Sequence, residues 1–153
     1  MKVDVQTEIE IMRPRAEVAG YAADLDHTTD WYANIETVEW KTPKPLQVGS
    51  RVAFVARFLG RRLSYTYEIR EYEAGERLVM STADGPFAME TTYQWEDAGA
   101  GSTRMRLRNR GNPSGFATLV GSAMASAMRR ANQKDLERLK HILESGERPT
   151  SND

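Results

Sequence analysis

Residues 87–110, FAMETTYQWEDAGAGSTRMRLRNR, contain two runs in which side chains of opposite character alternate. One face of these runs carries Phe87, Met89, Thr91, Tyr93, Trp95, Thr103, Met105, Leu107 and Asn109. The Gly99–Ala100–Gly101 loop separates the two runs. A period of two predicts β-strands that each bury one face, and a short glycine loop between them predicts an antiparallel hairpin.

The same period occurs on the N-terminal side of this hairpin. It predicts further strands at 3–11, 35–40, 52–58, 63–69 and 78–82. Short turns rich in Gly or Pro separate most of these segments. Consecutive strands with short connections indicate an antiparallel meander, and a sheet of seven twisted strands has to curl or be covered on its apolar face.

Helical spacing occurs in three places. Residues 14–25 and 26–34 predict two short helical segments between the first strand and the second. Residues 113–144 predict one long helix that begins after Asn112 and ends before Gly146. At about 1.5 Å per residue this helix is about 45 Å long, enough to cross the domain. We therefore expect an α+β fold, with a seven-stranded curved antiparallel sheet wrapped around a long C-terminal helix. The domain should span residues 1–146, with a disordered tail at 147–153.

The composition excludes several classes of protein. The chain has 153 residues, 28% of them charged, a net charge of −1, two His and no Cys. The lack of Cys excludes disulfides, thiolate metal sites and a cysteine nucleophile, and two distant His disfavour a zinc site. We expect no metal and no cofactor. A near-neutral charge argues against nucleic-acid binding, and no apolar run approaches the ~18 residues of a membrane span. We expect a cytoplasmic protein, either a monomer or a homodimer.

The order of these elements resembles a known superfamily. The stretch Asp24–Leu25–Asp26 followed by Trp31, and the segment Asn112–Pro113–Ser114–Gly115–Phe116 at the start of the last helix, are similar to the START-like helix-grip superfamily. The closest likeness is to its polyketide cyclase/dehydrase and lipid-transport branch, also called SRPBCC proteins, over residues 2–144. The resemblance implies a deep cavity between sheet and long helix that holds an apolar or amphipathic small molecule. Some relatives are enzymes and many are carriers or sensors, and the branch has no short catalytic signature.

The inward strand faces favour a cavity over a solid core. They are rich in Met, Tyr and Phe rather than branched aliphatics, and the helix is rich in Ala and Ser. The small helix residues either leave room for a ligand or allow close packing. Our candidate ligand-binding residues are Phe54, Phe58, Tyr65, Tyr67, Met80, Met89, Thr91, Phe116, Val120 and Met124.

Two functions fit these observations. The first is binding or carriage of a small hydrophobic or amphipathic molecule that is lipid-, polyketide- or aromatic-like. The alternative is an enzyme of the polyketide cyclase/dehydratase type, in which Tyr65, Tyr67 or Arg110 polarises a carbonyl or moves a proton. A protein-interaction module that uses the outer face of the sheet is a weaker third interpretation.

Charged residues elsewhere have simpler interpretations. The alternating Arg104, Arg106, Arg108 and Arg110 could form a nucleic-acid stripe. However, they predict cross-strand ion pairs if the last strand lies between the first and sixth, whose outer faces carry Asp4, Glu8, Glu10, Glu90 and Glu96. His27 lies near three Asp residues, which suits a general base or metal ligand but is more typical of a solvated helical face.

Overall fold

The computed structural model describes residues 3–58, 60–112 and 121–146. Its elements in chain order are β1 (Val3–Ile11), α1 (Arg15–Ala23), the single 3₁₀ turn η1 (Leu25–His27), α2 (Thr28–Trp31), β2 (Ile35–Trp40), β3 (Arg51–Phe58), β4 (Arg61–Glu73), β5 (Arg77–Asp84), β6 (Met89–Gly99), β7 (Ser102–Gly111) and α3 (Gly121–Ser145). This order confirms the predicted α+β arrangement. The predicted helical residues 113–120 and the predicted tail 147–153 lie outside the described residues.

The seven strands form one antiparallel sheet in the order β1-β7-β6-β5-β4-β3-β2. The hairpin predicted from residues 87–110 is β6–β7, in which Tyr93 faces Leu107 and Trp95 faces Met105. The first strand pairs with the last, so that Val5 faces Asn109 and Ile9 faces Met105. Because side chains alternate along each strand, this register gathers the apolar residues on one face of the sheet.

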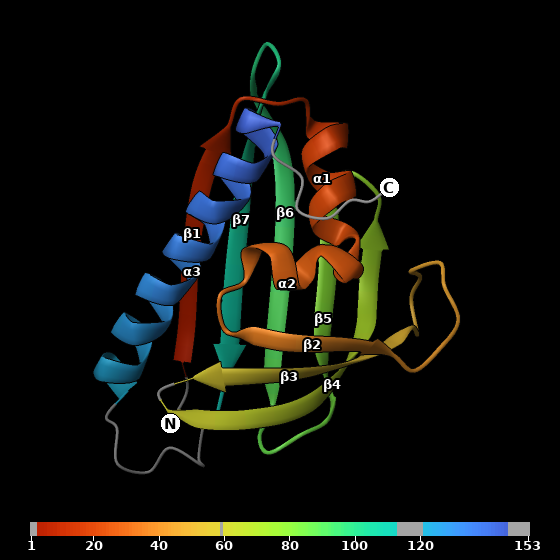
Figure 1. Ribbon diagram of the computed structural model, residues 1–153, viewed down its shortest axis with the longest axis vertical. Helices are drawn as coiled ribbons and strands as arrows, with labels where there is room; N and C mark the ends of the chain where they lie inside the picture. The colour runs from red at the N-terminus through yellow and green to blue at the C-terminus, as the bar shows by residue number, and fades with distance from the viewer. Residues whose placement is uncertain (1–2, 59, 113–120, 147–153) are drawn as a thin grey trace.

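The sheet is strongly curved. Figure 1 shows β2 and β3 running across the direction of β1, β7 and β6. The 13-residue β4 connects the two parts, and its pairing with β5 shifts register between Thr66 and Tyr67 and again between Ile69 and Glu71. A β-bulge bends a strand and increases its twist. The bulged β4 therefore helps to make the sheet concave on the side that faces the helices.

Ion pairs cover the outer face of β7. The described pairs are Arg104–Glu96, Arg104–Glu8, Arg106–Glu96, Arg106–Glu8, Arg108–Asp4 and Arg110–Glu90. The two nitrogens of the Arg108 fork donate to the two oxygens of Asp4, and this contact lowers the pKa of the Asp4 carboxyl. The predicted charge ladder is thus confirmed. Glu10 is the exception, since it accepts a hydrogen bond from the Ser102 hydroxyl at 3.3 Å.

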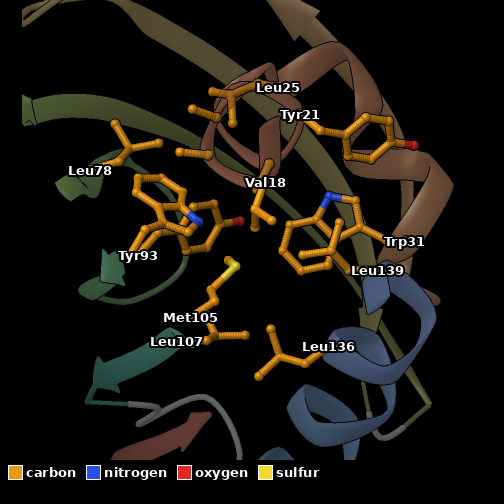
Figure 2. Packing of buried hydrophobic residues seen from close by; sticks show 14 of the residues in the cluster. Val18, Tyr21, Leu25, Trp31, Leu78, Tyr93, Met105, Leu107, Leu136 and Leu139 are labelled. Atoms are coloured by element: carbon orange, nitrogen blue, oxygen red, sulfur yellow. The ribbon is translucent and has the colours of Figure 1, made fainter. Parts of the chain in front are cut away.

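The core lies on the concave side, under the helices. Val18 of α1, Leu25 of η1, Trp31 of α2, and Leu136 and Leu139 of α3 belong to one buried cluster, and all five are at most 1% exposed. Figure 2 shows Trp31 next to Leu139. The C-terminal half of α3 thus packs tightly against the sheet and the short helices. None of the described helices combines the length and apolar character that a membrane crossing needs.

Candidate ligand-binding cavity

A cavity lies beside this core, under the part of α3 that precedes the buried Leu and Ile residues. Its volume is about 140 Å³, and its walls come from the concave face of the sheet, the segment around α2, and α3 between Met124 and Asp135. In this part of α3 the inward residues are Met, Ala, Asn and Asp, whereas beyond Asp135 they are Leu and Ile. The branched residues fill the space beneath the helix, and the smaller or polar ones leave it open.

The structure brings most of the predicted site residues together. Those that line the cavity are Phe54, Phe58, Tyr65, Tyr67, Met80, Met89, Thr91 and Met124. They come from the four strands β3, β4, β5 and β6 and from α3, and they meet because the curled sheet turns these strands toward the helix. Phe116 and Val120 lie outside the described residues.

Arg110 is not brought to the cavity. Its neighbour Asn109 points inward and lines the cavity, so the period of two places Arg110 on the opposite face of β7. There its guanidinium pairs with the Glu90 carboxylate on β6. Of the three catalytic candidates, only Tyr65 and Tyr67 therefore reach the cavity.

A chain of hydrogen bonds crosses the sheet wall of the cavity. The Thr91 hydroxyl donates to Asn109 Oδ1 at 2.6 Å, and the Tyr67 and Thr91 hydroxyl oxygens are 2.8 Å apart. Because Thr91 has one hydroxyl proton, which goes to Asn109, Tyr67 must donate to Thr91. Burial raises the pKa of Tyr67 to about 12, so this phenol stays protonated at neutral pH. The chain fixes the Tyr67 ring, which contacts the Tyr65 ring edge-on at 5.1 Å between centroids.

A second hydroxyl pair joins α2 to the sheet. The hydroxyl oxygens of Tyr32, which follows α2, and Tyr93 of β6 are 2.8 Å apart, and both residues line the cavity. Burial raises the pKa of both phenols well above the ordinary value, and the charge of Asp135 raises them further. Both hydroxyls therefore stay protonated and can donate to a ligand or to each other.

Two polar side chains of α3 face the same cavity. Asp135 is 3% exposed, and its Oδ1 accepts a hydrogen bond from the Ala33 backbone N–H at 3.1 Å. Burial raises the pKa of Asp135 to about 7, although the Ala33 hydrogen bond opposes the shift. Asn132, one helical turn earlier, is 5% exposed, and its Nδ2 has no hydrogen-bond partner among the described residues. Such groups are costly to bury unless something bonds to them.

The sequence interpretation missed Asn132, Asp135 and the Tyr32–Tyr93 pair. A signal for the first two exists in α3, where positions 124, 128, 132, 135, 139 and 142 are spaced by three or four residues and the outer four are Met124, Met128, Leu139 and Ile142. Positions 132 and 135 lie in the middle of this stripe, where polar residues interrupt its apolar pattern. A buried polar residue carries more information than an exposed apolar one.

His27 lies away from the cavity, on the surface beside α1. Its ring stacks on Tyr21 with centroids 4.1 Å apart, and its Nδ1 is 3.1 Å from Asp30 Oδ2, to which the Tyr21 hydroxyl also donates. His27 therefore has structural partners on the helical surface. Within the described parts of the chain, no three His, Asp or Glu side chains are placed to hold a metal ion.

Solved structures share this fold over nearly the whole chain. The protein TTHA0849 of Thermus thermophilus has a TM-score of 0.79 and 20% identity, covering 95% of this chain and 99% of that one. A START superfamily protein of Mycobacterium smegmatis has a TM-score of 0.79 and 12% identity, covering 93% and 97%. The Zhui aromatase/cyclase of Streptomyces sp. R1128 has a TM-score of 0.77 and 15% identity, covering 100% of both chains. At such identities these similarities establish the helix-grip fold alone.

Sequence comparison identifies the family. A comparison with curated proteins gives no match. The family model described as polyketide cyclase / dehydrase and lipid transport matches residues 2–144, which include every described helix and strand apart from the last residue of α3. With its curled sheet, its C-terminal helix and this match, the chain belongs to the polyketide cyclase/dehydrase and lipid-transport family.

Proposed function

We propose that this protein binds a small, mainly apolar molecule in the cavity and holds or carries it. The observation that carries the proposal is the cavity itself, whose wall is largely aromatic and Met side chains with a few polar groups at defined positions. Ligand sites in proteins have this composition, because apolar walls supply binding energy while the polar groups fix orientation. Membership of the family supports the same function.

The size of the cavity limits the ligand. At about 140 Å³ it is close to an engineered cavity of about 150 Å³ that binds benzene, and smaller than the ~300–1,000 Å³ of sites for drug-sized molecules. Larger ligands require wall side chains to move. Met80, Met89, Met124 and Met128 line the cavity, and Met changes shape at low cost. We therefore expect one aromatic ring to fit directly and a second ring to displace Met side chains.

The methionine methyl groups offer a direct test. Protein labelled with ¹³C in these methyl groups would be titrated with benzyl alcohol and then with 2-naphthylmethanol. The signals of Met80, Met89, Met124 and Met128 should move, whereas that of Met12, which is 67% exposed, should not. Movement of the Met12 signal alone, or of no methyl signal, would contradict binding in the cavity.

A pair of tryptophan substitutions on α3 provides the control. Ala131 lines the cavity, so Ala131→Trp should fill it and weaken binding of 2-naphthylmethanol. Ser126 is on the exposed side of the same helix, so Ser126→Trp should leave the affinity unchanged. Equal affinities in the two variants would place the bound molecule somewhere else.

An enzyme of the cyclase/dehydratase type is the second candidate. It is favoured by the polar groups that converge on the cavity, above all Asp135, whose pKa of about 7 suits a general base at neutral pH. In such a reaction an α-carbon gives its proton to Asp135 and forms a bond to a second carbonyl carbon. The π bond of that carbonyl breaks, and its oxygen takes the proton back from Asp135. The resulting hydroxy ketone then loses water. A short poly-β-keto thioester should lose the mass of water with the native protein and not with Asp135→Asn.

A further inference from the structure

The carboxylate of Asp135 has no compensating cation in the described part of the chain. Its only described hydrogen bond comes from the Ala33 N–H, and burial is the main cause of its raised pKa. Lys134 and Arg138 are exposed, and the Arg138 Nε donates to the Asp30 backbone oxygen at 3.4 Å. Arg57 also lines the cavity, but its Nε donates to Glu36 at 2.7 Å and its side chain is 59% exposed. An ionised Asp135 therefore makes this end of the cavity negative.

Several aromatic rings line the rest of the cavity. Phe54 stacks with Tyr65 at 5.5 Å between ring centroids and meets Tyr67 edge-on at 5.9 Å, and Tyr32 and Tyr93 also line the cavity. The faces of such rings carry partial negative charge and attract cations. The wall therefore suits an apolar body with a positively charged group more than one with a negative group.

Asn132 adds a second polar contact at the same end of the cavity. It lies three residues before Asp135, so both side chains project from the same side of α3. Its side chain is nine-tenths buried, and its carbonyl oxygen can accept a hydrogen bond. A primary ammonium has three donors, so it can donate to Asp135 and also to the Asn132 carbonyl oxygen.

We infer that the polar group of the ligand is an organic ammonium, which pairs with Asp135 while its aromatic or alicyclic body lies among Phe54, Tyr65 and Tyr67. This inference rests on the proposed function, since it requires that the cavity binds a ligand. An ammonium supplies the opposite charge that a buried carboxylate needs. A neutral alcohol supplies a donor without the charge, and a carboxylate ligand is repelled.

Two probes of the same size test this inference. 2-Naphthylmethylamine and 2-naphthylmethanol differ only in the ammonium and hydroxyl groups. At pH 8, where Asp135 is ionised, the amine should bind about tenfold more tightly or better, since hydrogen bonds to charged groups are stronger than neutral ones. At pH 5, where Asp135 is protonated, this preference should largely disappear. Titration of the Met methyl signals gives both affinities and reports whether each probe enters the cavity.

The pH dependence isolates Asp135 among the groups that face the cavity. The other titratable or charged groups in the wall are Tyr32, Tyr65, Tyr67, Tyr93 and Arg57. Burial raises the pKa of each of these tyrosines, so all four remain protonated from pH 5 to pH 8. A change in the amine preference over this range therefore reports on Asp135.

Substitution provides the matched comparison. Asp135→Asn keeps the shape and removes the charge, so it should abolish the amine preference at pH 8. Asp84→Asn, at the exposed end of β5, should keep the preference. Equal binding of both probes by the native protein at pH 8, with the cavity methyl signals moving, overturns the ammonium inference alone. Failure of both probes to move those signals overturns the proposed function as well.

Discussion

Replacing Asp135 by Asn should change how the stability of this protein depends on pH. Asn keeps the size of the side chain and an oxygen that can accept from the Ala33 N–H. It removes an ionisable carboxyl whose pKa burial raises to about 7, the only such carboxyl among the described residues. The substitution therefore isolates the cost of a buried charge from that of a lost contact.

The sign follows from the two pKa values. The folded protein keeps the Asp135 proton up to about pH 7, whereas the unfolded chain releases it near 3.8. Between these values folding takes up a proton, so the contribution of Asp135 is fully present below pH 3.8 and is lost as the pH rises through 7. At about 1.4 kcal/mol per pH unit, the difference between about 7 and 3.8 corresponds to up to about 4 kcal/mol.

Urea unfolding at several pH values between 4 and 8 measures this difference. Asp135→Asn should have about the native free energy of unfolding at pH 4 and exceed it increasingly up to pH 7, with no further gain above that. Taking the difference between the two proteins at each pH cancels the other titrating groups. Asp84→Asn, an exposed substitution, serves as the control. A difference between Asp135→Asn and the native protein that stays constant from pH 4 to pH 8 would refute the reasoning.

Further substitutions test the fold and the cavity wall by urea unfolding. Tyr67→Phe removes one buried hydrogen bond and should cost about 1 kcal/mol, and no measurable loss would show that the hydroxyl contributes little. A Cβ at Gly85 would lie 2.9 Å from the Cβ of Tyr65 in β4, so Gly85→Ala should lower the free energy of unfolding by about 1–3 kcal/mol. Gly20→Ala is its matched control, because nothing lies within 4 Å of that Cβ in helix α1, and it should stabilise by up to about 1 kcal/mol. Arg108→Ala removes the forked contact with Asp4, and the resulting small loss should shrink in about 1 M salt, which screens exposed charges.

The strands and their faces could be predicted from the sequence. A period of two assigns each side chain to a face before any strand is paired, so Phe54, Tyr67 and Thr91 are expected to point inward, and they line the cavity. The charge ladder is equally predictable, since the Arg residues of β7 alternate and acidic residues alternate on β1 and β6. These predictions depend on local geometry that the neighbouring elements do not alter.

The polar end of the cavity was decided by the tertiary structure. Asn132 and Asp135 are types of residue that usually face water, and only the packing of α3 against a curled sheet turns them inward. The same packing brings Tyr32, from a short segment near the start of the chain, within 2.8 Å of Tyr93. Sequence alone thus determined which residues form the sheet and its apolar face. The position of α3 over that concave face determined which polar groups meet inside, because such contacts depend on distances between elements far apart in the chain.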